Sequence, residues 1–301
     1  MYLHEVLQGR GRIMCPASAG NVVISARELD SALREDVPVI VLEVGRETGE
    51  GHGPRLSYAE GHIPGAHYVA FEKDLVGRPT GTTGNGPLPE VSDLQDRLRA
   101  WGVDDDSTVV VHTRQNPAVA TRAWWVLRWA GVADVRCLDG GFAAWQALGG
   151  PLDADVPTPA AGTAVVRPGS LPVLTAEDAG RLAASGHLID ARGPQAYAGD
   201  PQRTGTGHIP GAHSVPGSDN FSAGALRDAT ELRALYAPHL DGLTIGVYCG
   251  GGVSATTTVL ALASLGVEAA LYPGSWSAWI TDPARPAVTG NQPGAHPATA
   301  R

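Results

Sequence analysis

Three short segments of the chain, 39–44, 108–113 and 243–248, are nearly continuous runs of apolar residues rich in valine. Such runs are typical of strands that are covered on both faces, as in parallel sheets. Segments with the apolar periodicity of helices lie between and after them, for example 94–103 and 121–132. Alternating strands and helices predict an α/β fold, with mainly parallel sheets flanked by helices.

The same order of elements occurs twice along the chain. The heptapeptide GHIPGAH stands at 61–67 and again at 207–213. Each copy follows an apolar run that ends in an acidic residue. Each is followed by a helical segment, a strand, a second helix, and a short strand with a glycine–tryptophan element. This order indicates a tandem duplication and therefore two domains of the same fold.

Composition places the domain boundaries. Segment 149–170 is rich in proline, glycine and small residues, as linkers are, and segment 283–301 resembles it. The prediction is a flexible lead at 1–20, an N-terminal domain at 21–148, a linker at 149–170, a C-terminal domain at 171–282 and a flexible tail at 283–301.

The bulk composition excludes several classes of protein. With 43% hydrophobic and 18% charged residues, the chain is expected to be a soluble globular protein. A net charge of -9 and the lack of a basic cluster argue against a nucleic-acid partner. No apolar run is long enough to span a membrane and the start lacks an apolar signal sequence, so we expect a cytoplasmic protein without a membrane partner.

The three cysteines, Cys15, Cys137 and Cys249, are odd in number and widely spaced. This argues against a disulfide framework and against a metal site, and it fits a reducing compartment. Cys15 lies in the expected lead and Cys137 in a short apolar strand, so both are interpreted as structural. Cys249 differs from both in its sequence context.

Cys249 ends the apolar run 243–248 and is followed by a loop that leads into a helix starting near Ala255. The loop residues are Gly250, Gly251, Gly252, Val253 and Ser254. Glycines allow the backbone to turn several N–H groups toward one point, and a helix N-terminus adds positive potential. This arrangement would stabilise a thiolate, or a persulfide Cys–S–S⁻. The alternative is a small buried residue at a strand end.

These motifs, together with PGSWSAW at 273–279, resemble the rhodanese and 3-mercaptopyruvate sulfurtransferase family over about 21–282. The resemblance implies a catalytic C-terminal domain and a non-catalytic N-terminal domain, whose corresponding loop at 112–122 has no cysteine. It implies transfer of sulfane sulfur through a Cys249 persulfide to a thioredoxin-like protein, a small thiol or cyanide, without a cofactor.

The resemblance also implies roles for other residues. Arg192 and Arg203 match positions where mercaptopyruvate sulfurtransferases bind the substrate carboxylate; the alternatives are an ion pair of Arg192 with Asp190 and a solvated Arg203. His62 matches the family's histidine, or is a structural turn residue like His208.

The loop CGGGVS carries no cation and is closer to the loops of mercaptopyruvate-preferring members, so this donor is favoured over thiosulfate. The family's serine falls on Gly251, which departs from the pattern. Ser254 could donate to the persulfide or cap the helix.

Two other functions remain open. A cysteine phosphatase needs an arginine six residues after its cysteine, where this chain has Ala255. A non-catalytic binding module of the same fold is the second alternative; an intact Cys249 followed by its glycines argues against it.

Overall fold

The computed structural model describes residues 22–35, 37–47 and 53–295. The N-terminal domain contains a five-stranded sheet in the order β1-β5-β4-β2-β3, and all of its strand pairs are parallel. Its strands are β1 (Val23–Ile24), β2 (Val39–Gly45), β3 (His67–Ala70), β4 (Thr108–His112) and β5 (Asp134–Leu138). The predicted runs 39–44 and 108–113 form its two central strands.

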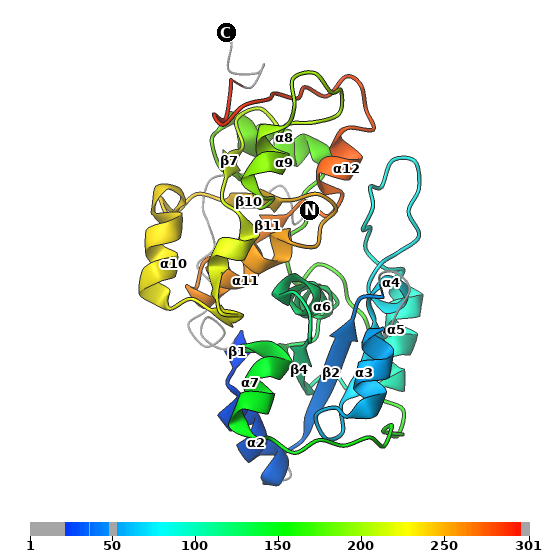
Figure 1. Cartoon of the computed structure of the whole chain (residues 1–301). Helices are drawn as coiled ribbons and strands as arrows, with labels where there is room; N and C mark the ends of the chain where they lie inside the picture. Colours follow the sequence, from blue (N-terminus) through cyan, green and yellow to red (C-terminus); the bar gives the residue numbers. More distant parts are fainter. Residues whose placement is uncertain (1–21, 36, 48–52, 296–301) are drawn as a thin grey trace.

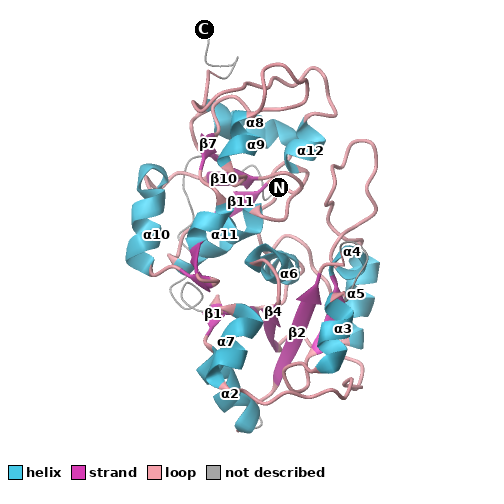
Figure 2. Ribbon diagram, viewed as in Figure 1, coloured by secondary structure: helices cyan, strands magenta, loops and turns pink. Residues whose placement is uncertain are grey.

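The C-terminal domain repeats this plan with a four-stranded parallel sheet in the order β11-β10-β6-β7. The sheet strands are β6 (Leu188–Asp190), β7 (His213–Ser214), β10 (Ile245–Tyr248) and β11 (Ala269–Leu271), and an antiparallel pair is formed by β8 (Phe221–Ser222) and β9 (Ala225–Leu226). The predicted α/β class with mainly parallel sheets is confirmed (Figure 2).

Helices surround both sheets (Figure 1). Those of the N-terminal half are α2 (Ala26–Arg34), α3 (Pro54–Glu60), α4 (Phe71–Asp74), α5 (Val91–Ala100), α6 (Pro117–Trp129) and α7 (Gly141–Leu148). Those of the C-terminal half are α8 (Ala176–Ala184), α9 (Pro194–Ala198), α10 (Ala229–Tyr236), α11 (Ala255–Ser264) and α12 (Ser275–Trp279), with 3₁₀ turns η1 (Gly217–Asn220) and η2 (Ala237–His239). Within the described residues, no helix is long and apolar enough to cross a membrane.

Equivalent helices begin with the same local chemistry in the two domains. Ser25 caps α2 and Thr175 caps α8, each through a capping box with an acid three residues later, Glu28 and Asp178. In such a box the hydroxyl accepts an N–H of the first turn while the acid accepts the N–H of the cap residue. The duplication therefore extends to the capping residues.

Helices α6 and α11 lie side by side between the two domains (Figure 1). Almost every residue of both helices is buried, which is typical of a helix that is apolar on all sides. The hydroxyls of Thr121 and Thr256 lie 2.8 Å apart across this contact. One continuous hydrophobic core contains residues of both domains, so the domains are fused rather than tethered.

The prediction of a flexible tail is corrected for 283–295, the described part of 283–301. The backbones of Val288 and His208 exchange hydrogen bonds, and the N–H of Gly211 donates to the carbonyl of Pro293. The tail thus forms hydrogen bonds with backbone groups of the second GHIPGAH segment. Composition alone does not reveal this contact. The predicted lead 1–20, with Cys15, lies outside the described residues.

Candidate active site

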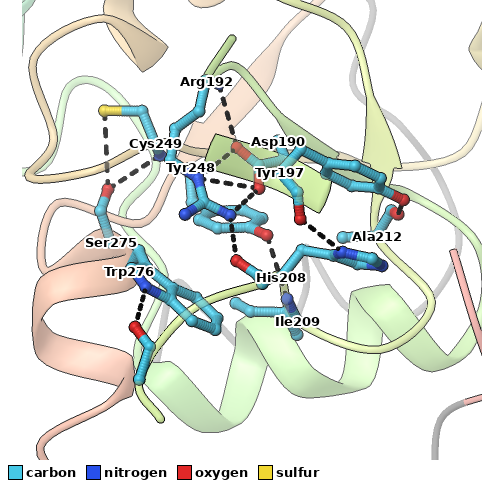
Figure 3. A network of polar contacts seen from close by, with 12 residues as sticks. Asp190, Arg192, Tyr197, His208, Ile209, Ala212, Tyr248, Cys249, Ser275 and Trp276 are labelled. Atoms are coloured by element: carbon cyan, nitrogen blue, oxygen red, sulfur yellow. Dashed lines mark hydrogen bonds and ion pairs between the residues drawn. The ribbon is translucent and has the colours of Figure 1, made fainter. Parts of the chain in front are cut away.

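Cys249 follows β10 directly and is almost completely buried, with 1% of its surface exposed. Its N–H donates to Oγ of Ser275 at 3.1 Å, and its carbonyl accepts from the N–H of Trp276 at 2.9 Å. Its Sγ lies 3.9 Å from Oγ of Ser275 (Figure 3). The start of α12 therefore fixes the backbone of the candidate nucleophile.

Carbonyl groups of the loop after Cys249 accept hydrogen bonds from other segments. The carbonyl of Gly250 accepts from the N–H of Ser277 at 2.9 Å, and that of Gly252 accepts from Nη1 of Arg122 at 2.9 Å. In the part of the chain that the structure describes, the N–H groups of 250–254 have no acceptor. These N–H groups are therefore available to an anion bound at the loop.

Gly252 is a position where the loop requires glycine. Its φ is +77°, and an added Cβ would lie 2.3 Å from the carbonyl oxygen of Pro273. A side chain there would push the loop off the segment that precedes α12. The glycine run therefore has a steric cause as well as a conformational one.

Ser275 is a site residue for which the sequence analysis named no role. It is fully buried with φ +52°, in the left-handed region that non-glycine residues rarely adopt. Its Oγ donates to the carbonyl of Tyr272 at 2.8 Å while accepting the N–H of Cys249. Strain of this kind is found where the surroundings hold a residue in place. The motif PGSWSAW was the signal that could have indicated it.

Arg192 lies in the same network but is already engaged (Figure 3). Its Nε and Nη2 donate to the buried carboxylate of Asp190, and Nη2 also donates to the carbonyl of Gly207 at 2.7 Å. The guanidinium lies 4.8 Å from the ring of Trp276. Although burial disfavours the charge, Asp190 raises the pKa of Arg192 above its ordinary value. The ion pair with Asp190, named as an alternative, is thus present. If Arg192 also binds the substrate carboxylate, as predicted, it would do so through Nη1.

Comparison with known proteins identifies the family. The model of the rhodanese-like domain matches the chain twice, at residues 25–148 and 175–282. The chain belongs to the rhodanese-like family. The predicted resemblance is confirmed.

Relatives of this rhodanese-like chain carry sulfurtransferase names. It is 41% identical to the thiosulfate sulfurtransferase SseB of Mycobacterium tuberculosis, over 90% of this chain and 98% of that protein. It is 38% identical to a 3-mercaptopyruvate sulfurtransferase of Pseudomonas aeruginosa, over 89% and 98%. The crystal structure of SseA from Escherichia coli, described as a 3-mercaptopyruvate sulfotransferase, matches with a TM-score of 0.73 and 29% identity, over 85% of this chain and 99% of that one. The chain is therefore an enzyme of the sulfurtransferase class, as predicted.

Arg203 of this rhodanese-like enzyme is exposed, as in the solvated alternative. The loop that carries Arg203 contacts the site through Trp276, whose Nε1 donates to the carbonyl of Gly205 at 3.2 Å. The loop, rather than the Arg203 side chain, makes the described contact with α12.

His62 has the contacts of a structural turn residue. It is buried, its ring stacks on Tyr58 at 3.9 Å, and Nδ1 lies 2.9 Å from the carbonyl of Tyr58. His208 repeats this arrangement with Tyr197. The two histidines differ at Nε2, which in His208 lies 3.0 Å from the carbonyl of Gln292 but in His62 is buried without a hydrogen-bond partner among the described residues. The assistance of His62 to catalysis stays a prediction.

A different N-terminal segment reaches the Cys249 loop. The N–H of Asn85 donates to Oγ of Ser277 at 2.9 Å, and Gly86 packs on the carbonyl of Gly251. In Figure 1 the arm that carries 84–87 rises from the N-terminal domain toward α12. No sequence signal except the glycines at 84 and 86 points to this role.

Ser254 precedes α11 and makes no capping bond through its side chain. The capping alternative is therefore wrong, and donation to a persulfide stays a prediction. At Gly251, an added Cβ would lie 3.4 Å from Cβ of Asn85 and 3.7 Å from Oγ of Ser277, both ordinary contacts. The site therefore accepts a Cβ at the position where the family resemblance places a serine.

The corresponding loop of the N-terminal domain carries Thr113 in place of the cysteine. The hydroxyl of Thr113 donates to the carbonyl of Val44 at 2.8 Å, and the following Arg114 pairs with the buried Glu43 at 2.6 Å. Burial lowers the pKa of the neighbouring His112 to about 3, so this ring is neutral at physiological pH. Two N–H groups of this loop are also engaged, since that of Gln115 donates to Oγ1 of Thr113 and that of Ala118 donates to Oδ1 of Asn116.

Proposed function

We propose that this enzyme transfers sulfane sulfur from 3-mercaptopyruvate to a thiol or to cyanide through a persulfide on Cys249. The observation that carries the proposal is the set of unoccupied N–H groups at 250–254 around a cysteine at the end of a buried strand. The N-terminal domain is proposed to be non-catalytic, because Thr113 and Arg114 replace the cysteine and the first glycine.

In the first half-reaction the Cys249 thiolate attacks the thiol sulfur of mercaptopyruvate. The carbon–sulfur bond breaks, the electron pair stays on carbon, and the former thiol proton ends there to give pyruvate. The outer sulfur of the resulting persulfide carries the negative charge, which the N–H groups of 250–254 stabilise in both half-reactions. In the second half-reaction an acceptor thiolate or cyanide attacks the outer sulfur, the S–S bond breaks, and the Cys249 thiolate returns.

The choice of donor is supported by the loop, which carries no cation between Cys249 and Ala255 to neutralise the dianion thiosulfate. The carboxylate of mercaptopyruvate is proposed to bind Nη1 of Arg192, with Arg203 as the second candidate cation. Thiosulfate is the second candidate donor, since the relative SseB is named for it at 41% identity. A thioredoxin-like acceptor and a reduced Cys249 suit a reducing compartment such as the cytoplasm.

The test compares wild type, Cys249→Ser and Cys137→Ser with both donors, with thiocyanate formed from cyanide as the readout. Cys137 is the matched control because it is also buried, and burial raises the pKa of its thiol far above the usual range. Turnover is expected in wild type and Cys137→Ser but not in Cys249→Ser, with the larger kcat/KM for mercaptopyruvate. Mass spectrometry of the donor-treated enzyme should show a gain of about 32 Da on the Cys249 peptide.

Folded, reduced wild type that forms neither thiocyanate nor a persulfide would contradict the proposal and favour a binding module. A larger kcat/KM for thiosulfate would keep the mechanism and replace the donor.

A further inference from the structure

Arg122 belongs to α6 of the N-terminal domain, yet its guanidinium contacts the Cys249 loop. The side chain is fully buried. Nη1 donates to the carbonyl of Gly252 at 2.9 Å, and Nη2 donates to the carbonyls of Gly86 at 3.1 Å and Pro87 at 3.2 Å. One side chain thus joins the loop of one domain to the arm of the other.

The charge of this group is not neutralised by a carboxylate. Within residues 22–35, 37–47 and 53–295, all three acceptors of Arg122 are neutral carbonyls, and its buried Nε has no acceptor. Burial lowers the pKa of Arg122 to about 10, and the nearby Cys249 thiolate raises it. The group stays charged at neutral pH, and the loop that its Nη1 contacts directly follows Cys249.

Arg128, further along α6, shows the ordinary arrangement. It donates to the carbonyl of Ala133, and although burial lowers its pKa, the carboxylate of Asp134 raises it. Both arginines are on one helix and bond to carbonyl groups, but only Arg122 faces the cysteine loop. Arg128 is therefore the matched control.

We propose that Arg122 is a positioning residue for sulfur transfer, which holds the Gly252 carbonyl away from the sulfur and supplies the buried positive charge for the thiolate and the persulfide. The inference rests on the proposed function of Cys249. It gives the N-terminal domain, which lacks a cysteine loop of its own, a part in the C-terminal site. A bidentate guanidinium suits this place because two loops must be held at once.

The experiment measures the rate at which iodoacetamide alkylates Cys249, followed on its peptide by mass spectrometry, over a series from about pH 5 to about pH 10. Arg122→Met and Arg122→Gln both remove the charge, and Arg122→Gln keeps an N–H donor for Gly252. Both should raise the midpoint of the pH profile by about one unit, which lowers the alkylation rate at neutral pH about tenfold.

Arg122→Lys keeps the charge and should leave the midpoint nearly unchanged. It should nevertheless lose turnover, because an ammonium cannot hold both loops in the same geometry. Arg128→Met should leave the midpoint unchanged.

Unchanged midpoints in folded Arg122→Met and Arg122→Gln would overturn the proposal and leave Arg122 a packing residue. If Arg122→Met does not fold, equal midpoints in Arg122→Gln and Arg122→Lys would overturn it as well. Alkylation needs no sulfur donor, so this outcome is distinct from failure of the sulfurtransferase itself, which would appear as wild type without thiocyanate formation.

Discussion

At the scale of single residues, the site depends on backbone positions as much as on reactive side chains. Ser275 stands in a backbone conformation that favours glycine, and its hydroxyl is shared between the N–H of Cys249 and the carbonyl of Tyr272. At Gly251, where the family resemblance places a serine, an added Cβ would make only ordinary van der Waals contacts. The position therefore accepts a Cβ, and what it lacks relative to the family pattern is a hydroxyl.

Gly251→Ser should therefore raise kcat/KM for 3-mercaptopyruvate about tenfold, a modest share of what a positioned acid–base group can contribute. The reason is that this donor must lose a thiol proton when its sulfur is transferred. Thiosulfate has no such proton, so its kcat/KM should stay within about twofold of wild type. The check is steady-state thiocyanate formation with each donor.

Gly251→Ala is the control, because it fills the same space without a hydroxyl. An equal gain for Gly251→Ala, or an equal gain with both donors, would show that packing and not proton transfer is responsible.

At the scale of elements, the arm at 84–87 closes the site from the opposite domain. An added Cβ at Gly86 would lie 2.2 Å from the carbonyl oxygen of Gly251, whereas one at Gly81, three residues before the arm, would meet nothing within 4 Å. A methyl group at Gly86 must displace backbone of the cysteine loop, because the atom that it meets first is a backbone oxygen and not a movable side chain.

Gly86→Ala should accordingly lower kcat/KM at least tenfold, since misplacement of a catalytic loop by about 1 Å can cost about a hundredfold in rate. Gly81→Ala should keep wild-type turnover. The measurement is kcat/KM with either donor, beside the midpoint of urea unfolding for each variant. Full activity in Gly86→Ala would mean that the loop tolerates the displacement and that the arm is not part of the site.

The elements also show what the sequence could and could not predict. The strands β2, β4 and β10 and the loop after Cys249 were predictable, because buried parallel strands and a glycine run before a helix are local patterns. The arm at 84–87 and Arg122 were not, because their roles arise only when two domains pack. The ion pair of Arg192 with Asp190 was one of two interpretations that the sequence left open, because the sequence does not show which acceptor a guanidinium finds in the fold.

At the scale of the whole molecule, the N-terminal and C-terminal domains share one hydrophobic core. Helices α6 and α11, each the helix after the threonine or cysteine loop of its domain, pack against each other, and residues of both sheets join the same core. The N-terminal domain, which has no cysteine in this loop, thus contributes about half of the shared core and also the arm at 84–87. Since neither half can bury its central helix alone, the chain should unfold as one unit.

Backbone amides of the central strands report this separately for each domain, β4 in the N-terminal sheet and β10 in the C-terminal sheet. Pulsed hydrogen exchange at increasing urea concentration, followed by mass spectrometry on a peptide from each strand, should give the same midpoint for both. Val109→Ala, in the buried part of β4, should lower the free energy of unfolding by about 2 kcal/mol, the usual cost of deleting buried methyl groups. Because the core is continuous, this change in the N-terminal sheet should lower the β10 midpoint as much as the β4 midpoint. A shift confined to β4 would show that the domains unfold independently, and the Cys249 loop would then have to be held in place by its own domain.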